Sequence, residues 1–338
     1  MRRFARKRRG AAMAKTASAP AGPRTGVHAS IAGGLPLAAE RAHAIGCQTL
    51  QIFSSSPRQW RGAELDPAAC AELTRLRRAY DLRPLVIHAN YLINAAGAAS
   101  GLWERSIEAL RGELRRARQL DADYLVLHPG AAGAGNGSAG AGDSAADGAN
   151  GPIGGGREAA IARVGEAVRR AAEGLDWGGL KLLIENTAGG GRLGGSWEEM
   201  AALLAAVATV PSGACIDTCH SWAAGYDVRS EAGYRDAMAG LDRTVGRKQV
   251  HVIHVNDSKG GLGSHQDRHE HIGAGQLGRA GLRLWVNDAR WARAAFILET
   301  PVDEPDDQRD DLRRLRALAG AARARPAARK ASRKPARR

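Results

Sequence analysis

Eight short apolar runs are spread along the chain, each bordered by glycine, proline or polar residues. Their length and their content of β-branched residues are typical of strands buried on both faces. The runs end at His28, Phe53, His88, His128, Glu185, Asp217, His254 and Glu299. Successive ends lie 25 to 57 residues apart, which suits repeated strand–loop–helix–loop units.

Amphipathic patterns fill most of the intervals between these runs. They predict helices over residues 67–80, 106–120, 158–173, 197–207 and 308–318. Eight alternating units predict an α/β fold, a (β/α)8 TIM barrel that forms one domain over residues 25–319. Ligands and catalytic groups of such barrels gather at the carboxyl ends of the strands.

The longest interval contains a low-complexity segment, residues 131–156, made almost entirely of Gly, Ala, Ser, Asn and Asp. This composition is typical of flexible chain, so we expect an unstructured insert on the catalytic face of the barrel. Without the insert, the interval is similar in length to its neighbours.

The net charge of +14 is concentrated in two tails. Residues 1–24 and 320–338 each contain eight Lys or Arg and no acidic residue, so residues 25–319 carry a net charge of −2. We expect both tails to be disordered. They either attract a polyanion or act as solvated solubility tails. No run of 18 apolar residues occurs, which argues against a membrane span.

The chain has four cysteines, Cys47, Cys70, Cys215 and Cys219, and no Cys-x-x-Cys pair. This usage favours a reduced, cytoplasmic protein. Cys215 and Cys219 could serve as soft metal ligands, but small buried side chains are the favoured interpretation.

Seven of the eight run ends are His, Asp or Glu, although the chain has only ten histidines. In a closed barrel these side chains share one mouth with His220, and Asp267 and His269 can join them if their loop is extended. Four carboxylates in one site repel each other unless divalent cations compensate. Imidazole and carboxylate ligands favour Zn, Mn or Fe over Mg or Ca, and nine ligands suit about three ions. Any one of these histidines could instead be a packed or hydrogen-bonded residue.

The ordered motifs of the chain resemble the endonuclease IV family of apurinic/apyrimidinic (AP) endonucleases. The resemblance runs from about residue 26 to residue 318, interrupted by the 131–156 insert. The motifs are Gly26-Val27-His28-Ala29-Ser30, His88-Ala89-Asn90-Tyr91-Leu92, His128-Pro129-Gly130, Ile184-Glu185-Asn186-Thr187, Cys215-Ile216-Asp217-Thr218-Cys219-His220, His254-Val255-Asn256-Asp257, Asp267-Arg268-His269 and Leu298-Glu299-Thr300.

The resemblance implies three zinc ions per chain. It assigns His88, His128 and Glu185 to the first ion, Glu185, Asp217, His254 and Glu299 to the second, and His220, Asp267 and His269 to the third. Glu185 and Glu299 would be catalytic as well, because they would also orient the nucleophile. His28 would bind no metal ion itself but would contact the metal ligands and help to position them.

The activity implied by the resemblance is hydrolysis of double-stranded DNA on the 5′ side of an abasic site. The products would be a 3′-hydroxyl and a 5′-deoxyribose phosphate, and blocked 3′ ends would also be trimmed. A metal-activated water would attack the phosphorus in line while the third zinc neutralises the leaving oxygen. Arg58, Tyr91 and Leu92 match positions that enter the duplex at the lesion. No motif demands a partner chain, so we expect a monomer.

Two other interpretations stay open. A metal-dependent sugar isomerase or epimerase would share the barrel, but it has little use for Asp267 and His269 as a third metal site. A DNA-binding protein without catalysis would rely on the basic tails and would predict an eroded ligand set. One departure from the family pattern is Ala131, which stands where a polar residue often follows the His128-Pro129-Gly130 motif.

Overall fold

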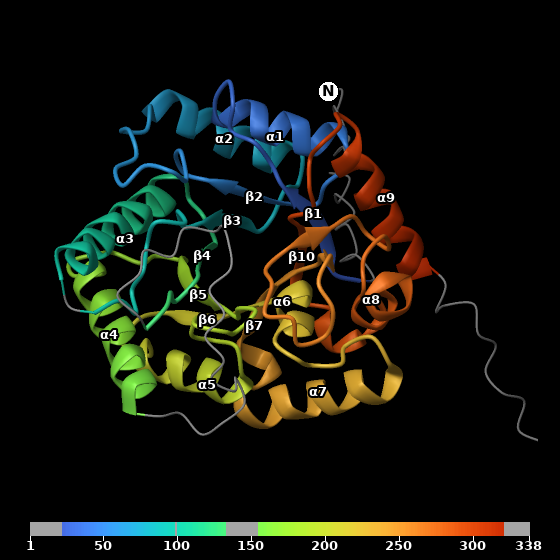
Figure 1. The fold of residues 1–338 in the computed structure, drawn as a ribbon. Helices are drawn as coiled ribbons and strands as arrows, with labels where there is room; N and C mark the ends of the chain where they lie inside the picture. Colours follow the sequence, from blue (N-terminus) through green and yellow to red (C-terminus); the bar gives the residue numbers. More distant parts are fainter. Residues whose placement is uncertain (1–21, 99, 133–154, 321–338) are drawn as a thin grey trace, which may run out of the picture.

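The computed structural model describes residues 22–98, 100–132 and 155–320. Eight parallel strands close into a barrel in the order β1-β10-β7-β6-β5-β4-β3-β2, and helices form a ring around them (Figure 1). The predicted TIM barrel is therefore confirmed. The strands are β1 (Arg24–His28), β2 (Thr49–Phe53), β3 (Leu85–His88), β4 (Tyr124–Leu127), β5 (Lys181–Glu185), β6 (Ser212–Asp217), β7 (Val250–His254) and β10 (Ala295–Leu298).

Six barrel strands end at the residue predicted from the apolar runs. The other two, β4 and β10, end one residue earlier, so His128 and Glu299 are the first residues beyond their strands. In either case the side chain stands at the same end of the barrel, because all eight strands are parallel.

The predicted helices correspond to α2 (Pro67–Ala79), α3 (Gly101–Gln119), α4 (Gly155–Ala171), α5 (Trp197–Ala206) and α9 (Asp307–Gly320). Four more were not predicted: α1 (Leu35–Ala44), α6 (Thr218–Ala223), α7 (Glu231–Thr244) and α8 (Gly278–Asn287). Two 3-10 turns, η1 (Arg247–Gln249) and η2 (Ala289–Trp291), precede β7 and β10.

Two apolar layers hold the barrel together. The inside is filled by small and branched side chains, namely Val86, Val126, Leu183, Cys215, Val252, Ala295 and Ile297. A larger cluster packs the outer faces of the strands against the helices. Burial on both faces explains why the strands appear in the sequence as continuous apolar runs.

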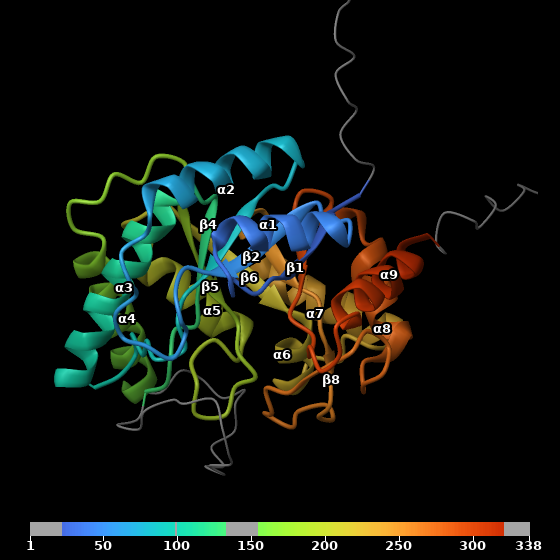
Figure 2. The same cartoon turned by 90° about the horizontal axis from the view of Figure 1, so that it is seen from above.

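A small antiparallel pair, β8 (Asp257–Ser258) and β9 (His269–Glu270), lies outside the barrel. It belongs to the loop between β7 and α8. Figure 2 shows β8 next to α6 at one end of the barrel, in agreement with the contacts between these two elements. This loop brings residues 267–269 to the mouth.

The disorder expected for the tails, and most of the expected insert, lies outside the described residues. Arg24, which we assigned to the tail, is the first residue of β1 and forms an ion pair with Asp81 at 2.6 Å. Gly155, which we assigned to the insert, is the first residue of α4. Ala131 forms a single antiparallel bridge with Arg192.

Candidate active site

A cavity of about 490 Å³ opens at the carboxyl ends of the barrel strands. Its lining comprises His28, Phe53, His88, Tyr91, His128, His220, Lys259, Asp267, Arg268, His269, Glu299, Thr300 and Pro301. A larger hollow of about 600 Å³ lies on the outside of the barrel between α4 and α5. No histidine lines that hollow, so the concentration of reactive side chains marks the mouth as the site.

The nine predicted ligands come together at this mouth in three groups. The first group is His88, His128 and Glu185; the second is Glu185, Asp217, His254 and Glu299; the third is His220, Asp267 and His269. Within each group one ligand atom per residue lies within 4.8 Å of the others. These are the groups that the resemblance implied, with Glu185 shared by the first two. Their role in metal binding stays a prediction.

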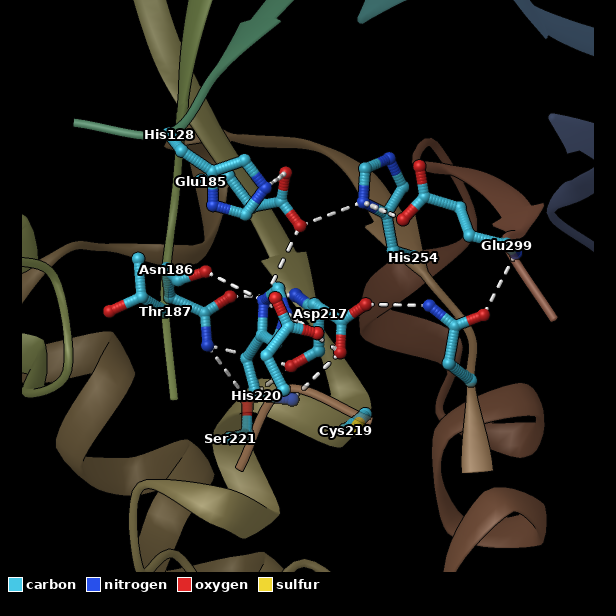
Figure 3. Close-up of polar contacts among 12 residues, drawn as sticks. His128, Glu185, Asn186, Thr187, Asp217, Cys219, His220, Ser221, His254 and Glu299 are labelled. Atoms are coloured by element: carbon cyan, nitrogen blue, oxygen red, sulfur yellow. Dashed lines mark hydrogen bonds and ion pairs between the residues drawn. The ribbon is translucent and has the colours of Figure 1, made fainter. Parts of the chain in front are cut away.

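The shared carboxylate of Glu185 is fully buried at the centre of the site (Figure 3). Its Oε2 lies 3.4 Å from His88 Nε2 and 3.2 Å from His128 Nε2. Its Oε1 lies 2.9 Å from His254 Nδ1, which is also 3.2 Å from Glu299 Oε2. One carboxylate therefore joins the ligands of two groups.

Three imidazoles are oriented by backbone carbonyls. His88 Nδ1 donates a hydrogen bond to Ala89 O at 2.8 Å. His220 Nδ1 donates to Asn186 O at 2.9 Å, and His269 Nδ1 donates to Glu299 O at 3.1 Å. A carbonyl oxygen can only accept, so Nδ1 carries a proton in each ring, and Nε2 is the nitrogen that faces the cavity and offers a lone pair when the ring is neutral. Metal-binding histidines typically donate a hydrogen bond in this way from the ring nitrogen that does not face the metal.

Several polar atoms that face the cavity have no hydrogen-bond partner. Glu185 Oε2, His220 Nε2 and His269 Nε2 are buried in this way. Yet His220 Nε2 is only 3.1 Å from Asp267 Oδ1, and His269 Nε2 is 3.5 Å from Asp217 Oδ2. Lone pairs that face each other at this distance repel unless a proton or a metal ion lies between them, and a buried polar atom without a partner costs about 1–3 kcal/mol. The donor set therefore fits bound divalent metal ions.

The charges of the site bring several pKa values far from their ordinary positions. Burial lowers the pKa of His220, but the carboxylates of Asp217 and Asp267 raise it well above its usual value. Burial raises the pKa of Glu185, but His128 and His254 outweigh it and hold the pKa well below the usual range. Burial lowers the pKa of His128 to about 4. At neutral pH the Glu185 carboxylate is therefore ionised and His128 is neutral, whereas the metal-free His220 ring is protonated, so an ion bound to the third group would displace a proton from His220.

Besides being a predicted ligand, Asp217 caps the helix that carries His220. As the N-cap of α6, its Oδ1 accepts a hydrogen bond from His220 N at 2.8 Å. Its Oδ2 accepts one from Asn256 Nδ2 at 2.6 Å. The same Asn256 fixes Glu299 by accepting a hydrogen bond from its backbone N at 2.8 Å.

Gln51 is a site residue that the sequence analysis missed. It lies fully buried inside β2, where its Oε1 is 2.9 Å from His254 Nε2 and its Nε2 is 3.0 Å from His28 Nδ1. His28 Nδ1 also lies 3.2 Å from Glu299 Oε1; its role in supporting the ligands stays a prediction. The available signal was a single amide in the middle of a short buried run, Thr49–Phe53, between Leu50 and Ile52.

Of the three residues expected to contact DNA, only Tyr91 lines the cavity. Its side chain is 47% exposed, and its ring packs edge-on against Phe53 with centroids 5.2 Å apart. Arg58 is exposed and Leu92 is partly buried, both outside the cavity lining. Lys259 and Arg268, which the sequence analysis did not single out, bring positive charge to the rim.

Both cysteines near the site are buried and free. Cys215 belongs to the apolar layer inside the barrel, and burial raises the pKa of its thiol to about 12. Cys219 Sγ faces Arg268 O at 3.7 Å. Each thiol also lies close enough to predicted ligands to form a candidate metal-binding group with them, Cys215 with Glu185 and His254, and Cys219 with Asp217 and His269, so the assignment of both as packing residues stays a prediction.

Comparison with known proteins separates the two enzyme classes that share this barrel. Residues 39–318 match a family model described as Xylose isomerase-like TIM barrel. The chain is 41% identical over 308 residues to the probable endonuclease 4 of Solibacter usitatus, covering 90% of this chain and 99% of that protein. The chain belongs to the endonuclease IV family.

Structural comparison agrees with membership of the endonuclease IV family. The crystal structure of endonuclease IV from Thermus thermophilus is similar, with a TM-score of 0.73 and 39% identity over 88% of this chain and 100% of that one. A D-tagatose 3-epimerase-like protein reaches a TM-score of 0.55 at 17% identity, over 89% of this chain and 100% of that one, which shows a shared fold alone. In the described part of the chain, no helix is both long and apolar enough to cross a membrane.

Proposed function

We propose that the chain is a DNA-repair endonuclease that hydrolyses the phosphodiester on the 5′ side of abasic sites in duplex DNA. The products would be a 3′-hydroxyl and a 5′-deoxyribose phosphate, and blocked 3′ ends would also be trimmed. The observation that carries this proposal is the convergence of all nine ligand residues on one mouth in a chain of this family.

Three zinc ions would occupy the site. His88, His128 and Glu185 would hold one, Glu185, Asp217, His254 and Glu299 the second, and His220, Asp267 and His269 the third. Bound zinc would lower the pKa of a water to about 7 and neutralise charge on the phosphate and the leaving oxygen. Manganese or iron suits some of the same ligands, so the zinc assignment needs metal analysis.

The catalytic carboxylates of Glu185 and Glu299 would orient the attacking water. Both lie against His254 Nδ1, at 2.9 and 3.2 Å, so their oxygens are fixed on one side of the cavity. Lys259 and Arg268 at the rim would attract the phosphates that flank the cleaved bond.

Selectivity for the lesion would come from residues at and beyond the rim. Tyr91 is half exposed beside the cavity, so its ring could stack where a base is missing. Arg58 and Leu92 would contact the duplex farther from the metal ligands. The basic tails would add affinity that depends on salt but not on sequence. We expect the enzyme to act as a monomer in the cytoplasm.

A gel assay tests the proposal directly. A duplex with one abasic site is incubated with the protein, with and without a strong chelator, and zinc, manganese and iron are measured in the purified protein. We expect incision on the 5′ side only without chelator and close to three zinc ions per chain. Absence of incision with a full metal content would refute the proposed activity. A single ion together with epimerase activity on ketoses would favour the sugar-enzyme alternative.

A further inference from the structure

Two of the three predicted ligands in the third group come from the loop between β7 and α8 rather than from a barrel strand. This metal-ligand loop, residues 257–278, joins β7 to α8 and carries Asp267 and His269. Its two short strands pair Asp257 with Glu270 and Ser258 with His269. The pairing is too short to fix a loop of this length, so other contacts must hold it.

The carboxylate of Asp257 gathers both ends of the metal-ligand loop. Asp257 is fully buried and accepts hydrogen bonds from the backbone N–H groups of Ser258 at 2.8 Å, Leu277 at 2.9 Å, and Gly273 and Gly278 at 3.1 Å. Among the described residues, no Lys, Arg or His side chain pairs with this carboxylate. Its oxygens therefore serve the loop backbone.

The loop backbone is built closely around this side chain. A Cβ placed on Gly275 would lie 2.4 Å from Ser258 O and 2.6 Å from Asp257 Oδ1, closer than real Cβ atoms approach. Only glycine fits there, because the chain passes directly over the carboxylate. Asp257 thus fixes the end of the return path, while nearer to His269 the carboxylate of Asp311 accepts a hydrogen bond from Ile272 N at 3.1 Å and pairs with His271 Nδ1 at 2.7 Å.

A second anchor ties the tip of the loop to α6, the helix that carries His220. Gly263 N donates to Trp222 O at 3.1 Å, and His265 N donates to Ala223 O at 2.9 Å. The side chain of Trp222 donates from Nε1 to Gly260 O at 3.0 Å. The tip and the base are therefore held independently, and residues 267–269 lie between the two anchors.

We propose that Asp257 is a positioning residue that holds Asp267 and His269 in place for the third metal ion before that ion binds. This inference rests on the proposed metal-dependent function and concerns the third ion alone. Asp257 is a member of neither the first nor the second group, and its carboxylate binds backbone N–H groups of the metal-ligand loop, so we expect its loss to affect the ions unequally.

The variant Asp257→Asn tests the inference. An amide keeps the size of the side chain but turns an NH2 group toward backbone N–H donors. Zinc content is measured after dialysis against chelators of graded strength. We expect the dissociation constant of one ion to rise by about 10- to 100-fold, as for other residues that support metal ligands, while two ions stay bound as tightly as in the wild type. Added zinc should restore incision.

Asp288→Asn is a matched control. Asp288 likewise accepts a hydrogen bond from a backbone N–H group, that of Arg290 at 3.0 Å, but it caps η2 and its partners lie outside the metal-ligand loop. We expect it to retain all three ions. If Asp257→Asn retains three ions at wild-type strength, or loses all three equally, the inference is wrong. If the wild type itself holds no zinc, the proposed function fails as well.

Hydrogen exchange on the wild-type protein covers the case in which Asp257→Asn does not fold. In chelated protein, we expect the amides of Gly273, Leu277 and Gly278 to stay protected, because Asp257 binds them without metal. Exchange as fast as that of exposed amides would show that the loop is ordered only by the ion, and would overturn the inference.

Discussion

The ligands on strands and the ligands on the loop are held in different ways. Glu185, Asp217 and His254 end barrel strands and are fully buried, so the sheet ladder and the packed core fix them together. On the loop, the side chain of Asp267 is 39% exposed and that of His269 is 17% exposed. A barrel strand places its last side chain as a by-product of folding, whereas the loop needs dedicated anchors such as Asp257.

The ligands on barrel strands, here called the strand-borne half of the site, are tested with Glu185→Ala. This change removes the carboxylate shared by two groups, so we expect two ions to be lost and incision to fall by more than about 10³-fold. Metal analysis and an abasic-site gel assay measure both effects, and circular dichroism checks the fold. Glu108→Ala is a control, since Glu108 is exposed on α3 and should leave activity unchanged. Retained incision in Glu185→Ala would contradict the assigned role.

The ligands on the metal-ligand loop, the loop-borne half of the site, are tested with His269→Ala, for which we expect a smaller loss of incision. We expect only the third ion to be lost and incision to fall by about 10²-fold, because the strand-borne ligands stay in place. The zinc content and the single-turnover cleavage rate of the variant measure these two effects. Loss of all three ions would show that the strand-borne and loop-borne ligands do not bind metal independently.

A substitution outside both halves sharpens the distinction between chemistry and recognition. Tyr91→Ala removes the ring that packs on Phe53 at the cavity rim. We expect kcat/KM on abasic duplex to fall by about 10-fold or more, within the 1–3 kcal/mol attributed to one stacked ring, while all three ions stay bound. Tyr91→Phe keeps the ring and should retain most of the activity. Equal activity in Tyr91→Ala and wild type would remove Tyr91 from lesion recognition.

The strand-borne half was also the part most accessible from sequence. A buried parallel strand is a continuous apolar run, and a run that stops at His254 or Glu185 marks both the end of the strand and the mouth. Six predicted strand ends are the last residues of their strands in the structure, whereas His128 and Glu299 each lie one residue beyond the end of the strand. The supporting residues were harder to find, because the partnership of Gln51 with His254 exists only once β2 and β7 face each other across the barrel.

Helices on the outside were less predictable, and α7 shows why. It contains Gly233 and Gly240, which weaken any helical pattern in the sequence. In the fold, a Cβ on Gly233 would lie 2.3 Å from Asp227 O, and one on Gly240 would lie 3.2 Å from Trp197 Cδ1. Tertiary packing therefore demands residues that local propensity disfavours.

The smallest expected effect on chemistry is that of the basic tails. Removing residues 1–21 and 321–338 deletes seven and eight cationic side chains and keeps Arg24, whose ion pair with Asp81 belongs to the barrel. We expect DNA affinity to weaken and its dependence on salt to become shallower, by about 0.9 in log–log slope for each phosphate that the tails no longer neutralise. Single-turnover cleavage of bound DNA should not change. The difference between Glu185→Ala and His269→Ala should be the same in the truncated chain, because the tails hold neither set of ligands. An unchanged salt slope would assign the tails to solubility alone.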